Sequence, residues 1–268
     1  MAKVRLDTLL HQRGLYPSRS AAAAAILAGD VRIGGRGSSG PGALKPGTQV
    51  DAGAEVEAAA PPRFVSRGGI KLANALERLA IDVDGRRALD VGASTGGFSD
   101  CLLQAGAAAV TAVDVAYGEL AWAVRNDPRV TVIERQNARH LTADQLPYAP
   151  DLVVADVSFI SLTKLLPALA AIVAPRFDAL LMVKPQFEVG RDRIGDGVVR
   201  DPALRREAIV TVATAARDGG WSVLAAAPSG LPGPKGNRET FLLLAEGARG
   251  GVDDLAALAL AAEPGEDA

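Results

Sequence analysis

Apolar residues in the middle of the chain fall into five short runs, at 88–91, 109–114, 130–133, 151–156 and 179–184. Near-continuous apolar runs of this length are typical of parallel strands that helices cover on both faces. Two further runs, at 221–226 and 239–245, predict a closing antiparallel pair. The pattern therefore predicts an α/β fold with a doubly wound, Rossmann-like sheet of seven strands.

The segments between these runs predict the helices that cover the sheet. Spacing and composition favour helices at 119–125, 161–173 and 202–218, and a stripe of leucines predicts one more that begins after Ser66. The segment 185–200 is rich in glycine and charge, and it predicts a long loop.

The first 60 residues follow a different pattern, which predicts a small module of two helices and short strands. Helical spacing of apolar residues begins at Val4, and Ser18 and Gly29 suit the cap and the stop of a second helix. Short strands are predicted at 31–33, 49–50 and 55–57, the last two as the arms of a hairpin.

Two prolines, Pro61 and Pro62, separate this module from the rest of the chain. Because successive prolines favour extended backbone, they predict a short and stiff linker. The predicted divisions are 1–60 for the small module, 61–66 for the linker, 67–246 for the α/β domain and 247–268 for an acidic C-terminal tail with a short helix.

The formal net charge of −2 conceals an uneven distribution along the chain. Residues 1–45 hold seven lysines and arginines against two acidic residues, whereas residues 247–268 hold one arginine against five acidic residues. A basic module is what a polyanion such as RNA selects. A solvated basic surface without a partner explains the charge equally well.

The chain has one cysteine and two histidines, which exclude an intrachain disulfide and any metal site that needs several of these ligands. No uncharged apolar run reaches the roughly 20 residues that span a bilayer, and the first residues lack the apolar core of a signal peptide. We therefore expect a cytoplasmic protein that binds no metal and does not act in a membrane. We also expect it to be monomeric.

A loop of small residues joins the first strand of the α/β domain to a helix. Such residues let backbone N–H groups at a helix N-terminus approach a ligand closely. Ser94 replaces the second glycine of the dinucleotide fingerprint, which disfavours a pyrophosphate and suits S-adenosylmethionine. Asp114 ends the second strand, where a carboxylate can accept hydrogen bonds from ribose hydroxyls. The predicted cofactor-binding residues are Asp90, Gly92, Ala93, Ser94, Thr95, Gly96, Gly97, Asp114, Asn137, Ala138 and Asp156.

The same loop contains Gly-x-Ser-x-Gly, the pattern of the nucleophile elbow in α/β hydrolases. A catalytic triad needs an acid and then a histidine later in the chain. After Ser94 the sequence has one histidine, His140, and it precedes the fourth strand, where a hydrolase histidine does not belong. An α/β hydrolase that uses Ser94 is therefore the weaker alternative.

Charged residues stand where three of the predicted strands begin or end. Asp156 ends the fourth strand, Lys184 ends the fifth, and Glu239 begins the last. We expect these three residues at the ends of the strands, where ligands bind in open α/β sheets. A structural ion pair between Lys184 and Asp156 is the alternative to a catalytic role. Lys71, which precedes the first strand, is a weaker candidate by position alone.

Six separated motifs resemble the TlyA family of ribosomal-RNA ribose 2′-O-methyltransferases, whose members are also named hemolysins. The motifs are VSRGGIKL from Val65, LDVGASTGGFS from Leu89, AYGELAW from Ala116, DVSFISL from Asp156, VKPQFEVG from Val183 and GLPGPKGNRE from Gly230. The resemblance implies a class I, FtsJ-like methyltransferase domain preceded by a small α+β RNA-binding domain. It also implies methyl transfer from S-adenosylmethionine to cytidine riboses of 23S and, in longer members, 16S rRNA. Susceptibility of ribosomes to capreomycin- and viomycin-type antibiotics is implied as well.

The resemblance further implies a catalytic tetrad of Lys71, Asp156, Lys184 and Glu239. In this interpretation Lys184 is the base or stabilises the developing alkoxide, and Asp156 orients it. Lys71 and Glu239 position the ribose. A membrane-active hemolysin and a non-catalytic RNA-binding scaffold are the alternatives outside this enzyme class.

The N-terminal module resembles the small RNA-binding domain first named from a small-subunit ribosomal protein. The predicted partner is therefore ribosomal RNA within ribosomal subunits, and a small protein-interaction module is the alternative. The predicted RNA-binding residues are Arg5, Arg19 and Arg32 in the module, and Arg63, Arg67, Arg135 and Arg139 around the cofactor pocket.

Overall fold

The computed structural model describes residues 3–16, 18–34, 36–37, 43–59, 62–190, 193–233 and 235–263. The chain divides into two compact units, Met1–Arg63 and Phe64–Ala268. This division falls inside the linker predicted at 61–66. The first unit has a hydrophobic core of its own, and the second has two, one on each side of its sheet.

The first unit is a small α+β fold in which two helices pack on short strands. Its elements are β1 (Lys3–Arg5), α1 (Leu6–Gln12), α2 (Arg19–Ala28), β2 (Val31–Arg32), β3 (Gln49–Asp51) and β4 (Glu57–Ala58). Leu6, Leu10 and Ile26 are completely buried between the two helices and the strands.

Local signals predicted the second helix of this unit better than its strand pairing. Ser18 Oγ accepts a backbone N–H at 3.1 Å at the start of α2, and Gly29 ends that helix with φ 92°. Val4 lies in β1, because it pairs with Val50 of β3, and the first helix therefore begins only after β1. The predicted hairpin is wrong, since β3 pairs with β1 and β4 pairs with β2.

The second unit is built on one seven-stranded sheet. Its strands are β5 (Arg87–Val91), β6 (Ala109–Val113), β7 (Val130–Ile133), β8 (Leu152–Ala155), β9 (Asp178–Val183), β10 (Trp221–Pro228) and β11 (Thr240–Glu246). They lie in the order β10-β11-β9-β8-β5-β6-β7. β11 is antiparallel to both of its neighbours, and the ladders from β9 to β7 are parallel. The predicted sheet and its closing antiparallel pair are confirmed.

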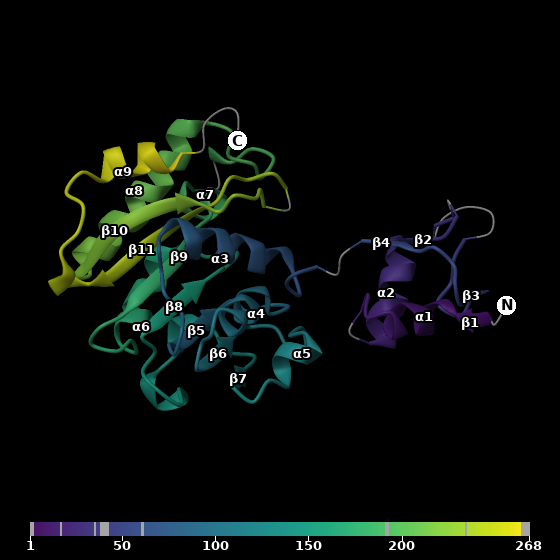
Figure 1. Ribbon diagram of the computed structural model, residues 1–268. Coiled ribbons are helices and arrows are strands. Elements are labelled where there is room, and N and C mark those ends of the chain that lie inside the picture. The colour runs from purple at the N-terminus through teal and green to yellow at the C-terminus, as the bar shows by residue number, and fades with distance from the viewer. Residues whose placement is uncertain are drawn as a thin grey trace. The chain divides into compact units, whose positions relative to one another are not determined.

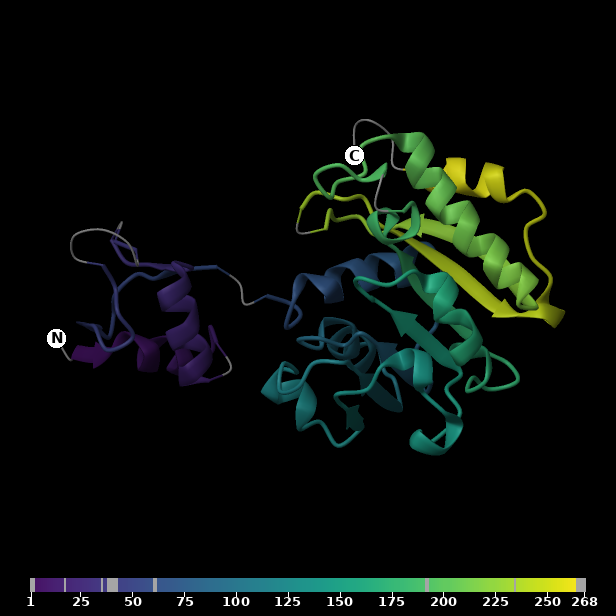
Figure 2. The ribbon, with the colours of Figure 1, turned by 180° about the vertical axis from the view of Figure 1, so that it is seen from behind.

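Helices cover both faces of this sheet (Figures 1 and 2). One face carries α3 (Arg67–Arg78), α4 (Gly97–Gln104) and α5 (Trp122–Arg125), and the other carries α6 (Leu166–Ala170), α8 (Pro202–Asp218) and α9 (Leu255–Ala262). Successive side chains of a strand point to opposite faces. In β9, Leu180 therefore packs in one core and Leu181 in the other, and both are completely buried. Burial on both faces is why the strands have continuous apolar sequences.

Short elements complete the second unit. Single 3-10 turns lie at η1 (Ala138–His140), η2 (Ala143–Gln145), η3 (Leu162–Lys164) and η5 (Gly247–Arg249). α7 (Pro185–Glu188) occupies the first residues of the segment predicted as a long loop, so that prediction is wrong there. Pro185 suits the first turn of a helix, because its missing N–H needs no partner at that position. Leu255 and Ala259 of α9 belong to a core of this unit, so the short helix predicted in the tail packs on the α/β domain.

Candidate active site

The carboxyl ends of β5, β8 and β9 and the start of β11 meet at one edge of the sheet. Val91 pairs with Ala155, so Gly92 and Asp156 follow their strands side by side. Val183 pairs with Thr240, and this antiparallel register places Lys184 next to Glu239. Strand pairing therefore brings together three charged residues that are far apart in the sequence.

Two lysine–carboxylate pairs occupy this edge. Lys71 of α3 donates from Nζ to Glu239 Oε2, and these residues are 6% and 3% exposed. Lys184 Nζ lies 2.5 Å from Asp156 Oδ1, and Lys184 is also buried. Burial of charged groups is tolerated when they are paired, as they are here. The four predicted tetrad residues thus form two adjacent ion pairs.

Lys184 has a further partner that the sequence did not suggest. Ser158 Oγ accepts a hydrogen bond from Lys184 Nζ at 2.9 Å. Ser158 lies two residues after Asp156, in the loop that joins β8 to η3. Ser158 belongs to the DVSFISL motif, but nothing in that motif marks its hydroxyl as a partner of Lys184, and only the fold brings the two together.

The loop after β5 makes close backbone contacts that only glycine allows. A Cβ on Gly92 would lie 2.6 Å from the carbonyl oxygen of Asp156, and Gly92 has φ +83°. Gly96 has φ +92° and precedes the first turn of α4. A Cβ on Gly97 would lie 2.2 Å from Ser66 Oγ. The predicted small-residue loop is therefore packed against β8 and against the start of α3.

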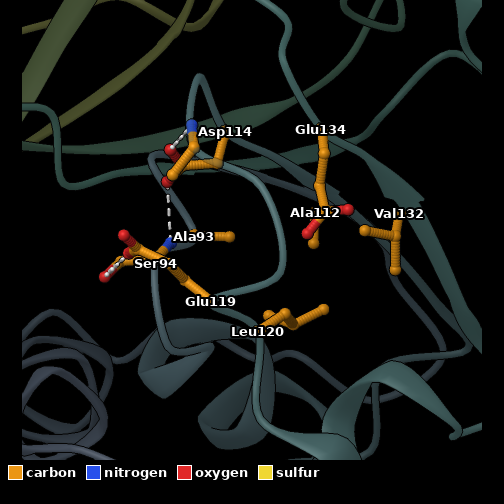
Figure 3. Close-up of a pocket in the computed structure, with 9 residues that line it drawn as sticks. Ala93, Ser94, Ala112, Asp114, Glu119, Leu120, Val132 and Glu134 are labelled. Carbon is orange, nitrogen blue, oxygen red and sulfur yellow. Dashed lines mark hydrogen bonds between the residues drawn. The ribbon is translucent and has the colours of Figure 1, made fainter.

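A small hollow opens beside this loop, and Figure 3 displays the residues that line it. Asp114 follows β6 and accepts hydrogen bonds from the backbone N–H groups of Ser94, at 2.7 Å, and Ala116, at 2.8 Å. These bonds fix the carboxylate at the rim and leave it acceptor capacity for a ligand, since a carboxylate has about four lone-pair positions. Glu119 and Glu134 also line the hollow, and sequence reasoning missed both.

Asp90 lies beneath the loop and is completely buried. Its Oδ2 accepts a hydrogen bond from Ser99 Oγ at 2.7 Å, whereas Oδ1 has no protein partner. Burial raises the pKa of this carboxyl to about 7. A buried oxygen without a partner costs free energy unless a donor reaches it. The ammonium group of a bound methionine moiety is a donor of the required charge.

The observations on this loop fit S-adenosylmethionine. The glycines leave room for close backbone approach, Asp114 offers oxygens for ribose hydroxyls, and Asp90 has an unsatisfied oxygen. The remaining predicted cofactor residues have local roles that are compatible with this. The backbone carbonyl of Thr95 accepts the N–H of Ala121, and the Asn137 side chain caps η1, which begins at Ala138.

The predicted RNA-binding arginines are divided between the two units. In the first, Arg5 and Arg19 both contact the buried carboxylate of Asp7, and Arg5 holds the pKa of that carboxyl well below its usual range. Arg32 lines a hollow of the same unit. In the second unit, the Arg135 guanidinium lies 4.3 Å from the centre of the Tyr117 ring. Arg67 begins α3, Arg139 lies in η1, and Arg63 is the last residue of the first unit.

The contacts of Ser94 do not resemble those of a hydrolase nucleophile. Its hydroxyl donates to Glu119 Oε2 at 3.4 Å, and its φ is +47°. His140 lies in η1, with its backbone N–H bonded to the Asn137 carbonyl. The described contacts therefore give Ser94 a carboxylate as its neighbour in place of an imidazole.

Residues 64–246 match the FtsJ-like methyltransferase family, and residues 4–37 match the S4 domain family. The chain is 50% identical over 245 residues to the 16S/23S rRNA (cytidine-2′-O)-methyltransferase TlyA of Mycobacterium tuberculosis, with 90% of each chain covered. It is 36% identical to Hemolysin A of Brachyspira hyodysenteriae, covering 88% of this chain and 97% of that protein.

A solved structure with the name hemolysin, from Streptococcus thermophilus, superposes with a TM-score of 0.72 at 37% identity, and the alignment covers 98% of this chain and 96% of that one. An S-adenosylmethionine-dependent methyltransferase structure from Listeria monocytogenes has a TM-score of 0.50 at 15% identity, over 67% of this chain and 98% of that one, and it supports the fold alone. No helix in the described part of the chain is both long and apolar enough to cross a membrane.

Proposed function

The chain belongs to the TlyA family of FtsJ-like methyltransferases, and we propose that it transfers a methyl group from S-adenosylmethionine to the ribose 2′-hydroxyl of cytidine in ribosomal RNA. The observation that carries the proposal is the pair of lysine–carboxylate contacts at one edge of the sheet, next to the glycine loop. Such a site suits a reaction that removes a proton from a weakly acidic hydroxyl and needs no metal.

Bound S-adenosylmethionine supplies an already electrophilic methyl group. The protein therefore has to bind the two substrates, orient them and accept a proton. The loop from Gly92 to Gly97 offers backbone N–H groups at the start of α4. Asp114 would accept hydrogen bonds from the cofactor ribose, and Asp90 would accept from its ammonium group; the free acceptor positions of both carboxylates support this assignment. An ionised Asp90 is favoured once that ammonium group approaches, because an opposite charge lowers the pKa of a carboxyl.

Lys184 is the residue that we assign to the acceptor hydroxyl. Its Nζ is held by Asp156 and by Ser158, and this leaves one direction of the tetrahedral nitrogen for the 2′-oxygen. As a neutral amine, Lys184 takes the proton of the 2′-hydroxyl with its lone pair; as an ammonium group it donates an N–H to the developing alkoxide, and the proton then leaves to water. The buried pair of Lys71 and Glu239 stands beside it and positions the ribose. Fixed geometry of this kind lowers the entropic part of the barrier.

We assign recognition of the RNA to residues outside the methyl-transfer site. Ribose methylation carries no base specificity, so the cytidine must be selected through RNA shape and contacts to the base. The basic first unit matches the S4 domain family, and its arginines Arg5, Arg19 and Arg32 are the proposed contacts there. The mycobacterial relative is named for both 16S and 23S rRNA. We propose the same substrates for this chain, with action in the cytoplasm as a monomer and susceptibility to capreomycin- and viomycin-type antibiotics as a consequence.

The proposal is tested by incubating purified 30S and 50S subunits that lack the modification with methyl-labelled S-adenosylmethionine. We expect the wild-type chain to label RNA, and Lys184→Ala to label it at least about a hundredfold more slowly with unchanged RNA binding. Near-normal single-turnover transfer by Lys184→Ala would refute the assigned role of Lys184. Absence of label from both subunits with wild-type protein would refute the proposed activity.

A further inference from the structure

The loop between β8 and η3 is attached to the Lys184 segment at both of its ends. At its first end, Asp156 and Ser158 contact Lys184 Nζ at 2.5 and 2.9 Å. At its second end, the Glu188 carboxylate of α7 accepts from Ser161 Oγ at 2.6 Å and from the backbone N–H of Leu162 at 2.9 Å. Lys184 and Glu188 stand immediately before and at the end of α7, so one short helix holds the whole loop.

The middle of this loop has a backbone conformation that needs such support. Phe159 has φ +66°, which is uncommon for a bulky residue and costs on the order of 1–3 kcal/mol. Its side chain is 91% exposed, so burial does not hold it in place. Its ring packs on Phe187 of α7, with ring centroids 5.4 Å apart. The contacts on both sides of Phe159 therefore maintain the local strain.

A buried carboxylate at Glu188 carries a desolvation cost that a purely structural hydrogen bond does not require. Burial raises the pKa of its carboxyl, which means that the folded protein disfavours the charged form. A neutral side chain would cap the N–H of Leu162 without that cost. The carboxylate is suited to hold two donors at once, the Ser161 hydroxyl and the Leu162 N–H.

We propose that Ser158 is a positioning residue for Lys184, and that Glu188 keeps Ser158 in place by holding the far end of its loop. A lysine ammonium group has three N–H donors. The Ser158 hydroxyl accepts one of them and the Asp156 carboxylate lies in ion-pair contact with the nitrogen, so two sides of Nζ are occupied and the remaining side is left for the acceptor oxygen. Without the Ser158 hydroxyl, Nζ can rotate about the single remaining contact. This inference rests on the methyl transfer proposed above.

The test measures single-turnover methyl transfer to ribosomal subunits at saturating enzyme and cofactor. We expect Ser158→Ala to slow transfer about tenfold, with the dissociation constants for S-adenosylhomocysteine and RNA within twofold of wild type. Ser158→Thr keeps the hydroxyl at an exposed position and should restore the rate. Glu188→Ala should also slow transfer about tenfold. The matched control, Glu207→Ala, removes a carboxylate from an exposed ion pair with Arg193 and should leave the rate unchanged.

The double variant Ser158→Ala/Glu188→Ala tests the link between the two residues. If Glu188 acts through Ser158, the double variant is no slower than the slower single variant, whereas independent roles multiply to about a hundredfold. If Glu188→Ala does not fold, Glu188→Gln retains an oxygen for the Leu162 N–H, and its rate in place of the alanine variant completes the comparison.

Wild-type rates for Ser158→Ala, failure of Ser158→Thr to restore the rate, or multiplicative losses in the double variant would each overturn the inference while the proposed function stands. Absence of transfer by the wild-type chain would overturn the proposed function, and this inference with it.

Discussion

Gly92→Ala is expected to disable the site while leaving most of the fold intact. A Cβ at this position would lie 2.6 Å from the Asp156 carbonyl oxygen, whereas ordinary contact begins at 3.4 Å. The backbone of β5 or β8 must therefore yield by roughly 0.8 Å if one contact takes up the whole difference. Asp156 is also tied to this point, because its N–H bonds to the Val91 carbonyl at 2.9 Å.

The loss of stability that we expect in Gly92→Ala has two parts. A non-glycine residue at φ +83° costs about 1–2 kcal/mol of stability, and the collision adds roughly 1–3 kcal/mol. The functional loss is larger, because displacement of a catalytic group by about 1 Å can cost on the order of a hundredfold in rate. We therefore expect methyl transfer to fall at least a hundredfold and affinity for S-adenosylhomocysteine to fall at least tenfold.

Gly85→Ala is the matched control for this variant. Gly85 has φ +69°, and a Cβ there would meet nothing within 4 Å. It should therefore lose about 1–2 kcal/mol of stability and retain cofactor binding and activity. Calorimetric titration with S-adenosylhomocysteine, denaturant unfolding and single-turnover assays measure the three quantities. Wild-type affinity and rate for Gly92→Ala would refute the role that we assign to this close approach.

Three further predictions concern the buried charges and the first unit. Lys71→Met leaves Glu239 buried without its partner, so denaturant unfolding should give a free energy of unfolding about 3 kcal/mol below that of wild type. The double variant Lys71→Met/Glu239→Leu should recover most of this loss. Equal stability of the single and double variants would contradict the burial of the two residues as a pair. Burial raises the pKa of Asp90 from its ordinary value of 3.8 to about 7, so the stability gained from its neutral form is complete below the unfolded pKa and is lost as pH rises through 7. Asp90→Asn, which does not titrate, should therefore gain at least about 1 kcal/mol relative to wild type between pH 5 and pH 8 in thermal or denaturant melts, and an unchanged difference across this range would oppose a protonated Asp90. Deletion of residues 1–60 should abolish methylation of ribosomal subunits while calorimetry still detects S-adenosylmethionine; loss of both would mean that the first unit is structural.

The succession of short apolar runs in the second unit was enough to predict its sheet, because every strand from β5 to β9 is short and largely apolar. The helix α8 was predicted with the same bounds, since Asp201 and Pro202 give a clear start and two glycines a clear stop. Pairing in the first unit was not predictable in the same way. Its strands have two or three residues, and such short segments carry too little alternation to specify a partner.

The site was predictable where chemistry and strand ends coincide. The sequence singled out Asp156, Lys184 and Glu239 because a charged side chain at the end of an apolar strand must be paired or reach water. Position alone gave little support to Lys71, and its pairing with Glu239 depends on how α3 packs across the sheet. Ser158, Glu188, Glu119 and Glu134 lie in loops or at element ends, where polar residues are ordinary. Three of the four lie in the motifs quoted for the family resemblance, but the partners of their side chains follow from tertiary contacts, which those motifs do not specify.

The ribose of cytidine in ribosomal RNA is the methyl acceptor that we propose. The acceptor is identified by labelling ribosomal subunits with the wild-type chain and methyl-labelled S-adenosylmethionine, digesting the RNA to nucleosides and separating them. We expect label in 2′-O-methylcytidine, accumulating at least about a hundredfold more slowly in reactions with Lys184→Ala. Label in a base-methylated nucleoside, or in the ribose of another nucleoside, would contradict the proposal.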